Sequence, residues 1–145
     1  MIDVREILDG STELAAEAML VLRPRWGTPA ELIDVIDTHL RPVGYRLVGV
    51  FLDDEVQAVA VAGFREVSAL AWGNCLYVDD LSTLPAKRGA GHADRLMTWL
   101  GEEARRLGCE GVHLDSGVGA DRAAAHRLYM RHKLRISAHH FQRDL

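Results

Sequence analysis

Residues Tyr77 to Leu96 read YVDDLSTLPAKRGAGHADRL. The first part is apolar and β-branched, as in a strand, and the last part has the spacing of an amphipathic helix. Between them, Arg88 to Ala93 form a glycine-rich turn. A turn of this kind leaves several N–H groups without an intrahelical partner, at the positive end of the helix dipole. The stretch therefore predicts a site for phosphate or pyrophosphate.

This stretch resembles motif A of the GCN5-related N-acetyltransferase (GNAT) superfamily. The motif reads Arg/Gln-x-x-Gly-x-Gly/Ala, and Arg88, Gly91 and Ala93 match it. In the family the preceding strand often ends Asp-Leu-x-Val-x-Pro, which Asp80 to Pro85 resemble. A Gly-x-Gly alone is weak evidence, but here a strand precedes it and a helix follows. The resemblance implies an enzyme that uses acetyl-CoA as the acetyl donor.

The order of the expected elements agrees with this resemblance. We expect strands at residues 2–7, 45–52, 56–64, 74–84, 111–116 and 136–144, and helices at 12–22, 29–40, 92–107 and 122–132. Ser11 or Thr12, Thr28 and Asp121 are the expected helix caps. The sequence thus predicts an α/β (α+β) GNAT fold, with a mixed, mostly antiparallel central sheet and helices on both faces.

Composition narrows the class of protein further. The 145 residues suit one domain, 1–145, and are 48% hydrophobic and 26% charged. The net charge of −4 argues against a nucleic-acid partner. The N-terminus lacks a signal pattern, and no apolar run approaches the roughly 20 residues that cross a bilayer. We expect a cytoplasmic protein without a membrane partner.

The resemblance assigns the cofactor site residue by residue. Backbone groups of the turn would hold the pyrophosphate, and the backbone of the preceding strand would pair with the pantetheine arm. Arg122 stands where the family often has an asparagine that contacts the cofactor, so that contact is an open question. The residues assigned to acetyl-CoA are Leu81, Ser82, Thr83, Arg88, Gly89, Ala90, Gly91, His92, Ala93 and Arg122.

Tyr129 is the expected proton donor to the leaving thiolate. The family often carries Asn-x-x-Ala-x-x-x-Tyr on this helix, and Ala125 and Tyr129 match it. A phenol of pKa near 10 can protonate or hydrogen-bond a thiolate whose acid has a pKa near 8.5. The alternative is that Tyr129 only packs. Lys133-Leu134 replaces the family's usual Gly-Phe, so the turn after this helix is expected to differ.

Asp79 and Asp80 are the expected acidic residues of the acceptor site. Alternation along a strand places them on opposite faces, so that one faces the pocket. That carboxylate would attract an ammonium group or accept its proton through a water molecule. The resemblance also implies that the loop with Arg25 and Trp26 borders the acceptor pocket, as the corresponding loop does in the family, although Trp26 that simply packs is an equal alternative.

These residues predict transfer of an acetyl group to a primary amine of a small molecule, by direct attack in a ternary complex. One alternative is a non-catalytic module that binds or senses acyl-CoA, and another is an acetyltransferase for protein N-termini or lysines. A P-loop is excluded because Lys-Ser/Thr does not follow the glycines. No metal is expected, since His132, His139 and His140 lack a ligand spacing. Family members often dimerise, so a homodimer is also considered.

Overall fold

A five-stranded sheet forms the centre of the molecule. The computed structural model describes residues 1–145. The sheet order is β1 (Ile2–Ile7), β2 (Arg46–Leu52), β3 (Ala60–Ala69), β4 (Gly73–Thr83) and β5 (Gly111–Leu114). Neighbours among β1 to β4 are antiparallel, and β5 is parallel to β4. This confirms the predicted mixed, mostly antiparallel sheet.

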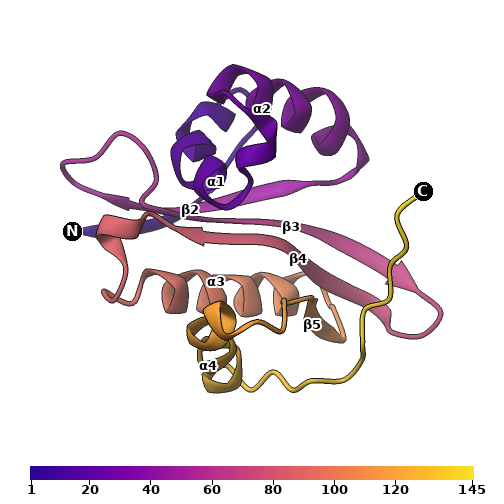
Figure 1. The fold of residues 1–145 in the computed structure, drawn as a ribbon. Coiled ribbons are helices and arrows are strands. Elements are labelled where there is room, and N and C mark those ends of the chain that lie inside the picture. Colours follow the sequence, from indigo (N-terminus) through magenta and orange to yellow (C-terminus); the bar gives the residue numbers. More distant parts are fainter.

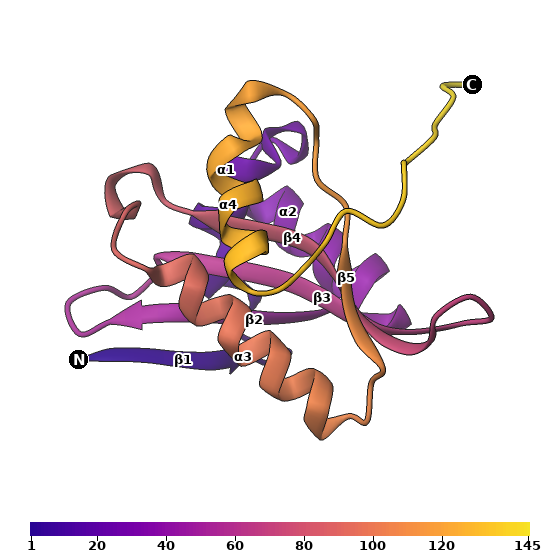
Figure 2. The ribbon, with the colours of Figure 1, turned by 90° about the horizontal axis from the view of Figure 1, so that it is seen from below.

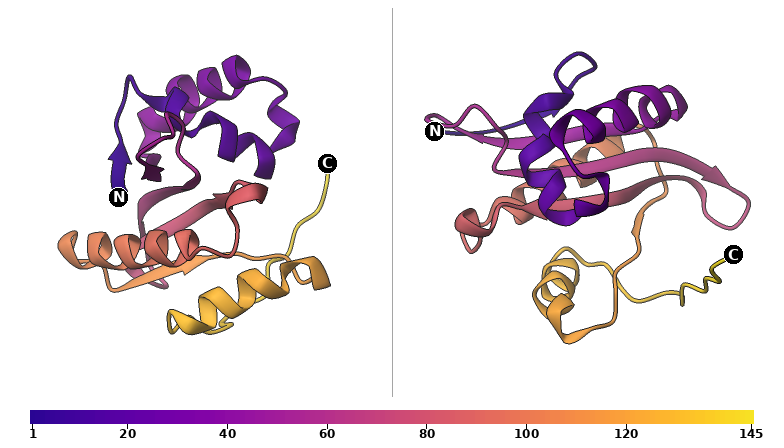
Figure 3. Two further views of the ribbon diagram at one scale, coloured as in Figure 1. Left: turned by 90° about the vertical axis from the view of Figure 1, so that its left-hand side faces the viewer. Right: turned by 45° about the horizontal axis from the view of Figure 1, so that its top comes forward.

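Helices cover both faces of the sheet, as predicted. Helices α1 (Ala16–Leu22) and α2 (Pro29–Val35) lie on one face, and α3 (His92–Arg106) and α4 (Ala123–Arg131) lie on the other (Figures 1 and 3). Strand β2 shows why both faces are apolar. Leu47 and Phe51 enter the cluster under α1 and α2, whereas Val48 and Val50 enter the cluster with α3. No helix is both long and apolar enough to cross a membrane.

The second predicted helix begins as its sequence indicates. Thr28 accepts a hydrogen bond from the Glu31 N–H, the Glu31 side chain accepts one from the Thr28 N–H, and Pro29 occupies the first turn. The other two expected caps are wrong. Ser11 makes no side-chain cap bond, and Thr12 donates to Asp37 instead. At α4 a 3₁₀ turn, Ala120–Arg122, precedes the helix, so Asp121 is not its cap.

Two strand predictions are also corrected. Residues 65–73, the expected loop between two strands, instead extend β3 to Ala69 and start β4 at Gly73. Across this hairpin the Asn74 amide donates to Glu66, and the Ser68 hydroxyl donates to the Asn74 side-chain oxygen. Val56 lies outside β3 and is exposed. The expected strand at 136–144 does not form. Residues 135–145 are exposed and pair with no strand.

Helix α3 is the long helix that follows the glycine-rich turn. Its buried side Leu96, Met97, Leu100 and Ala104 packs on the sheet. Gly101 lies in its interior, where a methyl group would meet only Arg105 Nη1 at 3.8 Å.

We therefore expect Gly101→Ala to stabilise the protein by about 0.5–1 kcal/mol, because alanine loses less backbone entropy in a helix than glycine. Urea unfolding measures this change. Gly108→Ala is the matched control and should destabilise, since Gly108 has φ +73. An unchanged or lowered midpoint for Gly101→Ala would contradict the prediction.

A charged network fastens α3 to the edge of the sheet. Glu103, which is 7% exposed, accepts hydrogen bonds from Arg106 at 2.6 Å and from Arg46. Arg46 also forms two bonds with Glu6 of β1. The Arg106 hydrogen bond, followed by that of Arg46, lowers the pKa of Glu103 from its ordinary 4.5 to about 2. The ionised carboxylate therefore stabilises the folded state above about pH 4.5, and that stabilisation is lost as pH falls toward 2.

We expect Glu103→Gln to lower the free energy of unfolding by about 2 kcal/mol at neutral pH, because charge-assisted hydrogen bonds are lost. The difference in unfolding free energy between the variant and the wild type should become smaller as pH falls below about 4. Urea unfolding across this range measures it, with the exposed neighbour variant Glu102→Gln as control. An equal difference in unfolding free energy at acid and neutral pH would contradict the stabilising role of the ionised Glu103 carboxylate.

Candidate active site

Strand β4 and the edge strand β5 pair at one end and separate at the other. Strands β4 and β5 pair only where Cys75–Val78 lie beside Gly111–Leu114. Beyond Val78, β4 continues to Thr83 without a neighbour on that side, and the strands diverge in Figure 2. An opening therefore lies between them, bordered by an unpaired backbone edge of β4. An extended, amide-bearing chain can pair with such an edge as an added strand would.

Because backbone groups alternate in direction along a strand, only every second residue of this part of β4 has its N–H and C=O directed to the opening. The Leu84 N–H donates to the Val59 carbonyl at 2.9 Å, on the β3 side. The backbone groups of Leu81 and Thr83 therefore point the other way, to the opening. Arg88 reaches the Thr83 carbonyl, to which its Nε donates at 3.3 Å. The backbone of Ser82 faces β3, and its hydroxyl donates to Ala18 of α1, so Ser82 fastens β4 to α1.

Six consecutive amides lie free at the start of α3. The N–H groups of residues 89–94 donate no hydrogen bond within the protein, and the first intrahelical bond runs from Arg95 to Gly91. Gly89 and Gly91 have φ values of +83 and +82, which favour glycine. The Arg95 side chain holds the turn by donating to the Ala90 carbonyl at 3.0 Å. This row of donors at a helix N-terminus fits a pyrophosphate.

The histidine of the turn is buried and neutral. His92 is 5% exposed, and its Nδ1 has no hydrogen-bond partner. Burial, together with the charges of Arg95 and Lys87, lowers the pKa of His92. The imidazole therefore adds no positive charge to the turn at neutral pH, and the amides supply the attraction for an anion.

Tyr129 lies on the same side of the sheet as these amides. It is 8% exposed and belongs to the apolar cluster against which Leu81 packs. Burial raises the pKa of Tyr129, and Arg122 partly opposes this rise. Helix α4 is tied to the first turn of α3, because Asp94 contacts His132 at 2.8 Å and Arg131 at 3.1 Å. The phenol is therefore held in place relative to the turn.

The expected separation of Asp79 and Asp80 onto opposite faces is wrong. The β3–β4 register shifts beside Gly63, so Asp79 is an extra residue in a β-bulge. Both carboxylates lie on the side of α1 and α2. Asp80 accepts from Arg23 at 2.7 Å and from the Tyr45 hydroxyl at 2.6 Å. Asp79 accepts from Arg65 at 3.0 Å, and burial raises the pKa of its carboxyl.

Sequence reasoning missed two charged residues that contact β4. Arg23 ends α1 and binds both Asp80 and the Asp79 carbonyl. Asp115 is the residue directly after β5. Burial, and then a hydrogen bond with Asp115, raises the pKa of Tyr77 to about 12. His140 also contacts Asp115 at 2.8 Å. Contacts between segments far apart in the chain bring these residues together, so no local motif could have indicated them.

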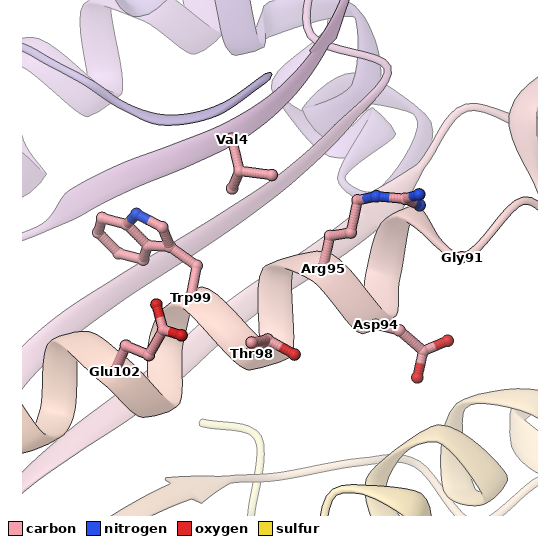
Figure 4. A pocket seen from close by; sticks show the side chains of 7 residues that line it. All are labelled: Val4, Gly91, Asp94, Arg95, Thr98, Trp99 and Glu102. Atoms are coloured by element: carbon pink, nitrogen blue, oxygen red, sulfur yellow. The ribbon is translucent and has the colours of Figure 1, made fainter. Parts of the chain in front are cut away.

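The predicted acceptor loop is a 3₁₀ turn, Pro24–Trp26. Arg25 lies over the Trp26 ring at 4.9 Å, and Trp26 packs against the cluster under α1 and α2. A pocket of about 510 Å³ runs along α3 from Gly91 and Asp94, at the glycine-rich turn, to Trp99 and Glu102, with Val4 of β1 across from α3 (Figure 4). It shares Gly91 and Asp94 with the row of free amides, and it extends toward β1, the sheet edge opposite to β5. No group of three metal-ligating side chains is present.

Comparison with solved structures relates this fold to known proteins. An acetyltransferase from Trypanosoma brucei has 21% identity and a TM-score of 0.80, with 100% of both chains covered. A putative acetyltransferase from Agrobacterium tumefaciens has 23% identity and a TM-score of 0.80, with 99% of both covered. The aminoglycoside N-acetyltransferase AAC(6')-Iy, in complex with CoA, has 14% identity and a TM-score of 0.80, with 99% and 95% covered. At these identities the likeness shows the fold.

The sequence comparisons show the family. A search of the curated proteins found no match. The family model described as the acetyltransferase (GNAT) family matches residues 9–133, which contain β2 to β5 and all four helices. The chain belongs to the GNAT acetyltransferase family and is an acetyl-CoA-dependent acyltransferase.

Proposed function

We propose that this acetyltransferase acetylates a primary amine of a small molecule, by direct attack in a complex that holds both substrates. The observation that carries the proposal is the unpaired β4 edge at Leu81 and Thr83, which leads toward the free amides of residues 89–94. Acetyl-CoA supplies the acetyl group as a thioester when it is bound. The donor set of this chain fits that molecule, since amides suit both a pyrophosphate and an amide-bearing arm.

The residues of the opening have separate tasks in this proposal. The amides of residues 89–94 bind phosphate oxygens. The Leu81 N–H is a free donor for a carbonyl oxygen on which negative charge develops, in the manner of an oxyanion hole. Tyr129 holds the proton that the leaving sulfur requires, and its burial keeps the phenol protonated at neutral pH.

The amine side of the site lies toward α1 and α2. Asp80 uses both carboxylate oxygens, on Arg23 and Tyr45, so it positions the end of α1 beside the bulge. Asp79 has a raised pKa and is held only by Arg65. We assign to Asp79 the acceptance of the amine proton through a water molecule. The turn with Arg25 and Trp26 borders this side.

A panel assay tests the choice of substrate class. Thiol release from acetyl-CoA is followed with small primary amines and, separately, with peptides that offer an N-terminus or a lysine, and mass spectrometry identifies the acetylated product. We expect small amines to give kcat/KM values at least about tenfold above those of the peptides. Acetylation of the peptides alone would contradict the proposed substrate class, and no acetylation of any amine would contradict amine transfer.

A further inference from the structure

A cluster of rings covers the sheet near the β3–β4 hairpin. Val78 and Leu114 pack in the cluster with α3, so by alternation their neighbours Tyr77 and His113 face the side of α1 and α2. The hairpin extends beyond both of these helices (Figures 1 and 3). The strands are therefore covered there by a side chain, Trp72, which stacks on this face of the sheet.

The indole of Trp72 has one stacked face and one open face. Its centroid lies 4.2 Å from that of the His113 ring, with an angle of 22° between the planes. The Tyr77 ring is 6.4 Å away and nearly parallel, at 9°. Because Tyr77 and His113 are partners in the β4–β5 register, the same indole face covers both. Trp72 is nevertheless 41% exposed, so its outer face is free to stack on a further ring.

Arg65 connects this cluster of rings to the amine side of the site. The Arg65 guanidinium lies over the Tyr77 ring, 5.2 Å from its centroid, and its Nε donates to Asp79 at 3.0 Å. Trp72, Tyr77, Arg65 and Asp79 thus form a continuous row, which ends at the carboxylate to which we assign the amine proton. An acceptor whose amine lies at Asp79 can therefore extend along this row toward Trp72.

The charges along the row restrict the chemistry of the distant part of such an acceptor. The three carboxylates beside the row are already paired with basic side chains: Asp79 with Arg65, Asp80 with Arg23, and Asp115 with His140. A second ammonium group on the acceptor would find all three engaged, and it would meet the like charge of Arg65. A flat aromatic ring meets no such repulsion, and the open indole face offers it a stacking surface.

We propose that the outer face of Trp72 binds an aromatic ring of the acceptor, so that the preferred substrates are primary amines that carry such a ring. Trp72 is then a specificity-determining residue, because it contacts the acceptor at a distance from the reacting nitrogen. The inference rests on the proposed function, since it places the reacting amine at Asp79. Nothing in it changes the bonds that are made and broken in acetyl transfer.

The first test measures binding and needs no turnover. Calorimetric titration compares phenylbutylamine with cyclohexylbutylamine, in protein saturated with CoA. The two amines have the same chain, which is long enough to pass Arg65, and only the first has an aromatic ring. We expect phenylbutylamine to bind at least about threefold more tightly, because stacked aromatic rings gain free energy beyond that of the buried area. Equal affinities, or binding of neither amine, would overturn the inference.

Substitutions of Trp72 separate stacking from damage to the hairpin. Trp72→Leu keeps an apolar side chain without a ring, and it should remove the difference in affinity between the two amines. Trp72→Phe keeps a ring and should retain part of the difference. Leu70→Ala, at the exposed tip of the same hairpin, is the control and should leave both affinities unchanged. A preference for phenylbutylamine that persists in Trp72→Leu would overturn the role of Trp72.

Steady-state kinetics extend the test to turnover. The kcat/KM for phenylbutylamine should exceed that for diaminohexane by about tenfold or more, because the second ammonium group meets Arg65. Equal values or the reverse order would overturn the inference but leave the proposed function in place, since both compounds are small primary amines. A wild type that acetylates no amine contradicts the proposed function instead, and the calorimetric comparison still decides whether Trp72 binds an aromatic ring.

Discussion

Tyr129→Phe should lower the turnover of acetyl transfer by about 100-fold or more, because it removes the proton that the leaving sulfur requires. Phenylalanine keeps the ring, which packs in the cluster shared by α3, α4 and β4. The variant should therefore fold and bind acetyl-CoA with nearly the affinity of the wild type. Steady-state kinetics give the turnover, and calorimetric titration gives the affinity.

Tyr77→Phe is the matched control for this change. The pKa of Tyr77 is also raised, to about 12, but the Tyr77 side chain faces Asp115 and Trp72 on the other side of the sheet. We expect its turnover to stay within a few-fold of the wild type. An equal loss in both variants, or an unchanged rate for Tyr129→Phe, would remove Tyr129 from the mechanism.

Gly91→Glu should weaken the binding of acetyl-CoA by about 100-fold or more, for two reasons that act together. Gly91 has φ +82, which is strained for any other residue, and an added Cβ would lie 3.2 Å from Arg95 Nη1. The new carboxylate would also place negative charge among the amides that attract phosphate. Calorimetric titration with acetyl-CoA measures the loss.

Gly10→Glu separates these effects from general strain. Gly10 has φ +88 and lies in the turn after β1, far along the chain from the free amides, and an added Cβ there would meet no atom within 4 Å. Gly10→Glu therefore adds the same negative charge as Gly91→Glu, at a residue with a similar φ. The two variants should therefore lose similar stability, while only Gly91→Glu loses affinity. Equal affinities in the two would contradict a phosphate site at residues 89–94.

The glycine-rich turn could be predicted from sequence because its geometry is local. The strand, the glycines and the amphipathic helix are contiguous in the chain, so the position of the free amides follows from short-range rules. The capping box at Thr28 could be predicted for the same reason. The resemblance assigned the backbone of Leu81 and Thr83 to the pantetheine arm, and in the structure these backbone groups face the unpaired edge of β4.

The bulge at Asp79 could not be predicted, because it depends on a partner strand. An added side chain at Gly63 of β3 would collide with the Tyr45 ring, and Tyr45 also binds Asp80. These contacts join residues far apart in the chain, and they turn Asp79 and Asp80 to the same side. The expected strand at 136–144 failed for a similar reason. Its composition allows a strand, but no neighbouring strand pairs with it.

Amide hydrogen exchange with and without CoA tests the central claim most directly. The N–H groups of Leu81, Thr83 and residues 89–94 donate no hydrogen bond on the open side of the free protein, so they should exchange rapidly. With saturating CoA we expect these amides to become protected together, while those of Val4 and Trp99, in the part of the pocket along α3 that lies toward β1, stay unchanged. Protection of Val4 and Trp99, with residues 89–94 still exchanging rapidly, would contradict an acetyl-CoA site between β4 and β5.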